Sequence, residues 1–266
     1  MRKTLQAASS WLGRGLAVTS ALAGASAMAS LVANGSFENT TPNISATTPW
    51  SCPSTAPCIV DDWSLAGAPN LYGQMVVHPS FVTNGYLFPA NYFYLGSQQV
   101  GIAGTLPLSP DGGNFLFSDA DFQNSPIDQL ITGLTPGALY LLTFYQALAQ
   151  DTEPGITTPG LVSANWNVSL GSSAVQSSAG MTANGITNTV SPWAQQSMYF
   201  TANTASELLR FVSVGSGDPP LIALDGVRLE RVPEPGTWLL AALGLVLTGA
   251  TYRRTRWQRL RASQVG

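Results

Sequence analysis

The sequence predicts an all-β fold, a β-sandwich, for residues 30–231. The apolar runs in this part are short, and Gly, Pro, Asn and Ser bound them, as is typical of the strands of a sandwich. No amphipathic helical pattern stands out among them. Tyr140, Leu142 and Phe144 share one face of an extended segment, and Leu141, Thr143 and Tyr145 occupy the other face. This segment is therefore expected to be a central strand.

The predicted strands cover residues 31–38, 76–78, 114–118, 129–134, 139–148, 165–170, 196–202, 208–214 and 221–230. A turn is expected in the segment Leu134-Thr135-Pro136-Gly137, because Pro136 at position i+1 and Gly137 at position i+2 suit a type II turn. We expect this turn to make a hairpin of the two strands beside it. Trp63, after two aspartates, is interpreted as a core residue under the sandwich.

The N-terminus has the features of a secretory signal peptide at residues 1–29. Arg2 and Lys3 form a positive start, residues 11–22 are mostly apolar, and Ala27-Met28-Ala29 offers a cleavage site. The mature chain is then expected to begin at Ser30. An uncleaved anchor is the alternative, but the apolar run is short and polar for a membrane span.

The charge of the body excludes some partners. Residues 30–231 carry thirteen Asp and Glu against three Arg and no Lys, a formal charge of −10, whereas the whole chain has −3. The difference arises because most basic residues lie in the two terminal segments. A nucleic-acid or anionic-lipid partner is not expected for such a domain, whereas neutral glycans, or anionic glycans bridged by divalent cations, fit.

Cys52 and Cys58 lie in a short Pro-rich loop. In an exported protein this spacing predicts a local disulfide that staples one loop. A metal pair is the alternative, but zinc sites normally use three or four Cys and His ligands. The sole histidine, His78, has no second Cys or His near it in the sequence.

The C-terminal part predicts a membrane anchor. Pro233 and Pro235 keep residues 232–235 extended. Residues 236–252 carry no charge and would form a helix of about 25 Å, near the short limit for a bilayer span. Arginines follow within the basic tail 253–266, which would stay in the cytoplasm and leave the body on the other side.

This order of Pro233-Glu234-Pro235, a short apolar helix and an Arg cluster resembles the PEP-CTERM sorting signal of bacteria. The resemblance implies a partner, the membrane cysteine protease exosortase, and a link to exopolysaccharide and biofilm. A plain tail anchor with a chance Pro-Glu-Pro is the alternative. The resemblance thus implies an exported chain, first anchored facing the periplasm and later at the cell surface or in the extracellular matrix.

A second resemblance covers most of residues 31–230. Asn34-Gly35-Ser36-Phe37-Glu38, the Leu134–Phe144 segment, Trp193, and Ala223-Leu224-Asp225-Gly226-Val227 follow in one order. Together they resemble a galactose-binding-like jelly roll, the fold of many carbohydrate-binding modules. The resemblance implies a structural calcium held by the residues at the Glu38 and Asp225 positions. Two ordinary turn residues are the alternative, and Gly226 stands where the family usually has a second aspartate.

Residues 84–94 contain five aromatic side chains between turn formers. Aromatic faces stack on sugar rings, so Tyr86, Tyr92 and Tyr94 are candidate ligand-binding residues. A purely structural role in the core is the alternative, since most aromatic clusters are buried.

Few side chains in the body could serve in catalysis. With one His, no Lys in the body and no Gly-x-Ser-x-Gly motif, only carboxylate chemistry is open, and Asp119 with Asp121 is the candidate pair. A solvated loop explains that pair equally. We therefore expect no enzyme, but an exported surface or matrix protein that binds extracellular polysaccharide. The alternatives are a purely structural biofilm matrix protein and a glycoside hydrolase or polysaccharide lyase.

Overall fold

The computed structural model describes residues 29–41, 59–65, 74–79, 105–121, 126–150, 160–184, 190–217 and 220–233. These ranges form a β-sandwich of two antiparallel sheets, so the predicted all-β class is confirmed. They contain no helix long and apolar enough to cross a membrane. Several predicted features lie outside the described residues, namely Cys52, Cys58, Tyr86, Tyr92, Tyr94 and the helix 236–252.

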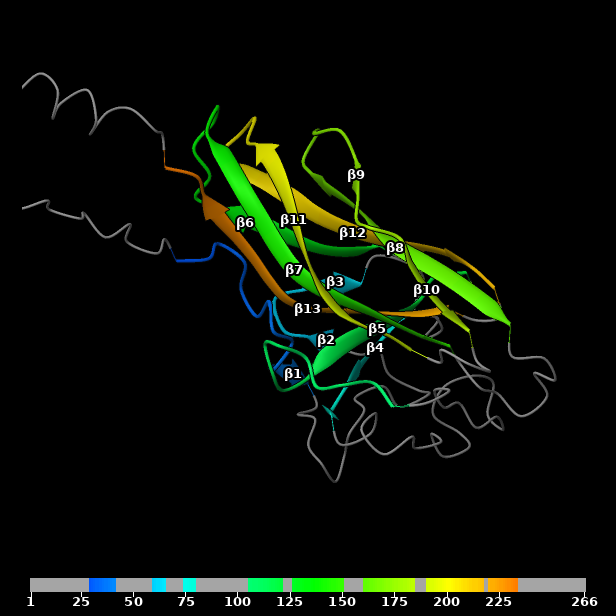
Figure 1. The fold of residues 1–266 in the computed structure, drawn as a ribbon. Coiled ribbons are helices and arrows are strands. Elements are labelled where there is room, and N and C mark those ends of the chain that lie inside the picture. The colour runs from blue at the N-terminus through cyan, green and yellow to red at the C-terminus, as the bar shows by residue number, and fades with distance from the viewer. Residues whose placement is uncertain are drawn as a thin grey trace, which may run out of the picture.

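The chain crosses repeatedly from one large sheet to the other (Figure 1). One sheet has the order β10-β8-β12-β6-β3, with β9 paired to β8: Ser64–Leu65 (β3), Ile127–Thr132 (β6), Leu161–Leu170 (β8), Gln176–Ser177 (β9), Met181–Asn184 (β10) and Ser206–Ser216 (β12). The other has the order β11-β7-β13-β5-β4: Gln74–Val77 (β4), Phe115–Asp119 (β5), Leu139–Gln150 (β7), Val190–Thr201 (β11) and Pro220–Arg231 (β13). A small third sheet pairs Thr40–Thr41 (β1) with Ile59–Val60 (β2).

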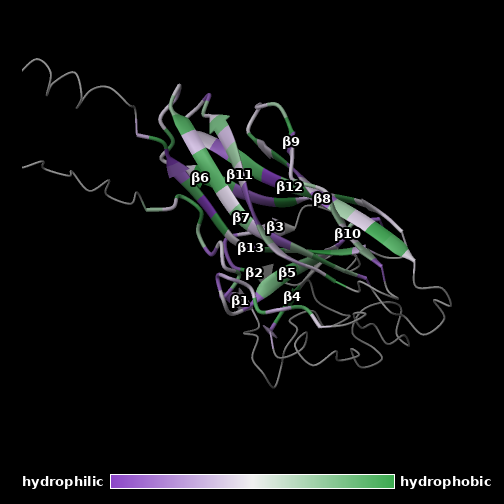
Figure 2. Cartoon of the chain, in the orientation of Figure 1, coloured by the Kyte–Doolittle hydropathy of each residue, from purple (hydrophilic) through white to green (hydrophobic). Residues whose placement is uncertain are grey.

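The main core lies between the two large sheets. Tyr140, Leu142 and Phe144 of β7 are at most 1% exposed and point into it, and β7 pairs on both sides, as predicted for a central strand. Trp166 of β8 and Phe211 of β12 face them, with Phe144 and Phe211 packed edge to face at 5.3 Å. Figure 2 shows the alternation of hydrophobic and paler positions along β7 and β8. Period-two burial on both sheets is what holds the sandwich together.

The turn at residues 135–138 forms as predicted, but it makes no hairpin. The Ala138 N–H donates to the Thr135 carbonyl at 3.0 Å, and Gly137 has a φ of 80°, as a type II turn requires. However, β6 before it pairs with β12 and β3, whereas β7 after it pairs with β11 and β13. The chain crosses from one sheet to the other here because each sheet needs a partner to cover its apolar face.

Residues 31–38 do not form the predicted strand. Asn34 and Phe37 have φ values of 46° and 56°, which breaks an extended run. The segment still follows β13, because the Leu31 N–H donates to Leu229 O and Gly35 O accepts the Val227 N–H. Asn34 holds the bend, since its side-chain amide donates to the carbonyls of Asn39 and Asp61, both at 2.8 Å. This irregular path brings Glu38 beside the middle of β13.

A second hydrophobic cluster covers one end of the outer face of the five-stranded sheet. Phe115 and Phe117 of β5 point away from the main core, and they pack with Leu106 and Trp193. The buried members of the cluster are Val77, Leu106, Phe115, Phe117, Ala147, Ala149, Leu221 and Ala223. The Trp193 indole N–H donates to the Pro107 carbonyl at 2.8 Å. This end of the sheet is therefore closed, and its other half is the part open to solvent.

Trp63 is 7% exposed and packs against Phe37 at 5.4 Å, so its predicted place in the core is confirmed. The predicted strands at 76–78, 114–118, 129–134, 139–148, 165–170, 196–202, 208–214 and 221–230 each coincide with an observed strand, with shifted ends. The strands β1, β2, β3, β9 and β10 were not predicted. They are two to four residues long, too short for a pattern of alternating apolar residues to stand out in the sequence.

Candidate functional site

A buried carboxyl group lies at a bulge in β13. Asp225 is completely buried, and the register with β7 shifts between Asp225 and Arg228. Gly226 adopts a φ of 57° at the bulge, in the left-handed region that glycine adopts without the steric cost of a Cβ. The Asp225 Oδ1 atom accepts the N–H of Gly226 at 2.7 Å, whereas Oδ2 has no hydrogen-bond partner. An unpartnered, buried carboxylate oxygen is costly unless it is protonated or meets a cation.

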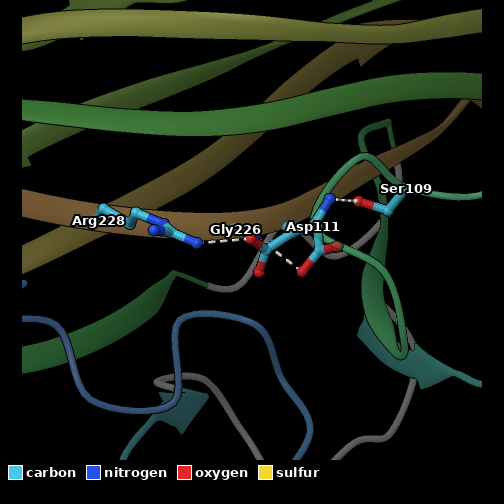
Figure 3. A network of polar contacts seen from close by, with 5 residues as sticks. Ser109, Asp111, Gly226 and Arg228 are labelled. Atoms are coloured by element: carbon cyan, nitrogen blue, oxygen red, sulfur yellow. Dashed lines mark hydrogen bonds and ion pairs between the residues drawn. The ribbon is translucent and has the colours of Figure 1, made fainter.

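The loop before β5 brings a second carboxylate to this bulge. The Asp111 side chain lies beside Gly226, where an added Cβ would come within 3.0 Å of the Asp111 Cβ. Arg228 forms an ion pair with Asp111 at 2.8 Å, and the Asp111 N–H donates to the Ser109 hydroxyl at 3.3 Å (Figure 3). Asp111 is therefore held in place by a turn on one side and by β13 on the other.

Glu38 reaches the same loop from the N-terminal segment. Its Oε1 atom accepts the N–H of Asn114 at 2.8 Å. Gly113 has a φ of 64°, and a Cβ at this position would overlap the Glu38 carboxylate. The turn at residues 111–114 thus wraps around the Glu38 carboxylate, which requires glycine at position 113.

The electrostatics of these groups reflect burial and like charge. The pKa of Asp225 is raised to about 8, mainly by burial and in smaller part by the charges of Asp111 and Glu38, while hydrogen bonds from Ser109 and Gly226 act in the opposite direction. Burial also raises the pKa of Glu38, with a smaller contribution from the charge of Asp111, against the hydrogen bond from Asn114. Asp225 is therefore neutral below about pH 8 unless a cation compensates its charge.

Three carboxylates thus influence one another at the junction of the N-terminal segment, the 109–114 loop and β13. The structure brings Glu38 and Asp225 to this junction, whereas the metal that the resemblance implied for them stays a prediction. In the described residues, however, no three His, Cys, Asp or Glu side chains are grouped as a ready metal site. These carboxyl groups can share protons, and carboxylate oxygens are also the ligands that calcium prefers.

Sequence reasoning missed Asp111 as a member of this junction. Its signal was the run Asp111-Gly112-Gly113-Asn114, a turn sequence placed just before a strand. Both glycines have positive φ, so the turn folds tightly enough to present Asp111 to β13. A turn sequence of this kind indicates only that a carboxylate lies in a loop. The strand against which the loop packs depends on the tertiary structure and cannot be read from the turn itself.

Asp119 and Asp121 are not arranged as a facing pair. Asp119, the last residue of β5, is 3% exposed, and its Oδ1 accepts the N–H of Asp121 at 3.0 Å. This is a local turn of the backbone around one aspartate, with Asp121 exposed beyond it. The interpretation as a loop therefore explains both residues.

The open half of the outer face of the five-stranded sheet carries an aromatic and polar strip. Tyr199 of β11 is 56% exposed, the highest value for an aromatic side chain in the described ranges. Tyr145 of the neighbouring β7 is half-buried on the same face. Tyr199 pairs with Leu141 and Tyr145 with Gln195, which places the two tyrosines about 13 Å apart along the strands. Thr143, Ser197 and Arg228 share the row between them.

Residues 231–256 are a PEP-CTERM protein-sorting motif. The resemblance noted in the sequence at Pro233, Glu234 and Pro235 is thereby confirmed. Within the structure, Pro233 is the last described residue and follows directly on the end of β13. No curated protein sequence matches this chain.

Solved structures with a similar fold include carbohydrate-binding modules. TmCBM61, solved in complex with β-1,4-galactotriose, matches at 12% identity and a TM-score of 0.35, over 76% of this chain and 99% of the module. The CBM22-1 xylan-binding domain of Xyn10C from Paenibacillus barcinonensis matches at 11% identity and a TM-score of 0.32, over 78% and 97%.

A match of a different kind is the enzymatically active domain of bacteriophage CBA120 tailspike protein 4. It has 11% identity and a TM-score of 0.33, and the match covers 76% of this chain but only 21% of the tailspike domain. The chain spans about a fifth of that protein. Carbohydrate-binding modules and one enzymatically active domain are thus both among the structural neighbours.

Proposed function

We propose that the chain is exported, held by a membrane helix at residues 236–252, and then processed by an exosortase-type protease. The sorting motif at residues 231–256 supports this proposal, together with the uncharged run after Pro235 and the basic tail. Cleavage would release the sandwich to the cell surface or the extracellular matrix. In that oxidising environment Cys52 and Cys58 would form their local disulfide.

Replacing Glu234 or Pro235 by Ala is expected to block this release while membrane insertion continues. The apolar run and the arginines that drive insertion and orientation are unchanged in both variants. Cell fractionation measures the ratio of anchored to released protein. Release of either variant as efficient as that of the wild type would contradict processing at this motif.

We further propose that the released sandwich binds an extracellular polysaccharide without catalysis. The observation that carries this proposal is Tyr199, an aromatic ring 56% exposed on the outer face of a sheet beside polar side chains. Sugar rings stack on such faces, while hydroxyl and amide groups nearby bind the sugar hydroxyls. Tyr86, Tyr92 and Tyr94 remain a second candidate platform, outside the described residues.

The geometry of the strip suits a polysaccharide ligand rather than a single sugar. Two tyrosines about 13 Å apart along the strands are separated by roughly the length of two to three sugar units. Thr143, Ser197 and Arg228 can donate hydrogen bonds between the two rings. The second hydrophobic cluster closes the other end of the face, so the ligand would lie along β11 and β7.

Tyr199→Ala is expected to weaken polysaccharide binding by about five- to tenfold, because one stacking contact is lost. Residues 30–231 can be tested by affinity electrophoresis in gels that contain neutral or acidic polysaccharides. Tyr199→Phe should retain most of the binding because the ring face is kept. Leu161→Ala is the matched control, because Leu161 is 66% exposed on the other sheet.

Equal binding by Tyr199→Ala and the wild type would exclude this strip and leave the platform at residues 86–94. If no polysaccharide retards the domain at all, the alternative of a purely structural matrix protein is favoured instead. Shortening of the polysaccharide during the experiment would favour a hydrolase or lyase.

We also propose that a structural calcium joins Glu38 and Asp225, with Asp111 as a third carboxylate. The unpartnered Oδ2 atom of Asp225 and the like charges around it support a cation at this junction. The ion would tie the N-terminal segment and the 109–114 loop to β13. Its role would be stability, since no substrate group needs to approach a fully buried carboxylate.

A further inference from the structure

Both ends of the described chain leave the sandwich at the same end (Figure 1). The N-terminal segment lies along the last part of β13, where the Leu31 N–H donates to Leu229 O. The C-terminal exit follows at once, with the Val232 N–H bound to Leu139 O at 2.8 Å. We call this end the exit end. It is formed by the turns at residues 133–138, 171–175 and 201–206 together with the exposed Leu130, Leu139 and Leu208.

The chemistry of the exit end differs from the rest of the domain. None of the residues in its three turns is charged, although residues 30–231 carry a net charge of −10. The charged residues beside these turns are the buried Glu207, which accepts the N–H groups of Asn203 and Thr204, and Glu230 and Arg231 at the end of β13. Leu130 and Leu208 form a cross-strand pair and are 62% and 37% exposed, and Leu139 on the other sheet is 41% exposed. Val175, in the turn after β8, is 63% exposed. Exposed apolar side chains gathered around turns without charged residues are typical of a surface with a partner.

The length of the connecting chain identifies that partner. Between Arg231, the last residue of β13, and the predicted helix at 236–252 there are only residues 232–235. Four residues span at most about 14 Å when fully extended. The headgroup region of one leaflet is itself roughly 5–8 Å thick. The exit end therefore lies at the lipid headgroups for as long as the chain is anchored.

We propose that the exit end is a membrane-facing surface that rests on the bilayer before the chain is released. Its leucines contact the boundary between headgroups and acyl chains, and the sandwich stands with its strands steeply inclined to the membrane. The absence of charge matters here, because the acidic remainder of the domain would be repelled by anionic lipid. The acidic residues Asp119 and Asp121, at the opposite end of β5, then point away from the bilayer. This inference rests on the anchor described under the proposed function.

A matched pair of spin labels tests the proposal in the full chain. Labels are attached to Leu130→Cys or to Leu161→Cys in a Cys52→Ser/Cys58→Ser background, and the chain is reconstituted into phosphatidylcholine vesicles. Leu130 and Leu161 are 62% and 66% exposed on the same sheet, about 30 Å apart along the strands at opposite ends. The label at position 130 is expected to collide more with oxygen than with a water-soluble nickel complex. The label at position 161 should show the reverse.

A second measurement uses the unmodified chain, in case the cysteine variants do not fold. Hydrogen exchange in residues 133–138 and 201–206 is expected to be slower in the anchored chain than after protease cleavage in residues 232–235. Exchange in residues 117–121 at the far end should be unchanged. Addition of anionic lipid should leave the contact in place, because the three turns carry no charged residue and the charges of Glu230 and Arg231 beside them are opposite in sign.

The outcomes separate this surface from its anchor. If the chain floats with the vesicles but both labels are equally exposed to water, the anchor stands and the membrane-facing surface is overturned. If the chain does not float with the vesicles, the helix at 236–252 does not anchor it, and the proposed membrane-facing surface is overturned as well. Equal hydrogen-exchange rates in residues 133–138 and 201–206 before and after cleavage would also overturn the membrane-facing surface, while the anchor would stand.

Discussion

Without divalent cations, the sandwich is expected to lose stability steadily as the pH rises from about 4 to 8. The pKa of Asp225 is raised from 3.8 to about 8 by burial, so in this range the native carboxyl is protonated and the unfolded one is ionised. The native state then binds more protons, and stability falls by up to about 1.4 kcal/mol per pH unit. Glu38, with its pKa also raised, acts in the same direction.

Asp225→Asn should remove most of this slope and make the cation-free domain more stable than the wild type near pH 8, by several kcal/mol. The amide keeps the shape of the side chain but cannot ionise. Urea unfolding of residues 30–231 in EDTA, at pH values between 5 and 8, measures the effect. His78 has its pKa lowered by burial and acts with the opposite sign, but it is the same in every variant.

Calcium should reverse the trend in the wild type. A divalent ion stabilises the ionised form of Asp225, so millimolar calcium should raise the stability more at pH 8 than at pH 5. Asp225→Asn and Glu38→Gln should both lose this response. Asp121→Asn, at an exposed aspartate outside the junction, is the control and should keep it. A full calcium response in Glu38→Gln, or its loss in Asp121→Asn, would place the ion elsewhere.

The sequence predicted those parts of the fold that depend on local alternation. The strand at 139–148 was recognised because Tyr140, Leu142 and Phe144 repeat every second residue, and the burial of these side chains follows directly. The pairing of that strand was not predictable from the turn at 135–138. A type II turn joins β6 and β7 whether they pair with each other or lie in different sheets, so the choice depends on distant strands.

The candidate site shows the same division. Glu38 and Asp225 lie at one junction, but not on two adjacent strands as the resemblance implied, because residues 31–38 form no strand. Asn34 bends the N-terminal segment, and the glycines at 112 and 113 fold the loop that adds Asp111. Tyr199 was missed because one tyrosine in an apolar strand looks like a core residue. Only the register of β11 on β7 turns its ring to the solvent.

Gly35→Ala is expected to destabilise the domain by about 2–4 kcal/mol, although it adds only one methyl group. A Cβ at position 35 would meet the backbone oxygen of Val227, which cannot rotate away as a side chain could. The segment would have to leave β13, and the hydrogen bond from the Val227 N–H to Gly35 O, at 2.9 Å, would be lost. Because Glu38 follows three residues later, the calcium response should weaken together with the stability.

Gly180→Ala is the matched control for this variant. An added Cβ at Gly180 meets no atom within 4 Å, and its backbone is not in the left-handed region. The change there should be within about 0.5 kcal/mol, because the substitution only restricts the unfolded chain slightly. Urea unfolding of both variants separates the two cases. Equal stabilities would show that the N-terminal segment does not lie against the bulge of β13, and the junction of Glu38, Asp111 and Asp225 would then lose its basis.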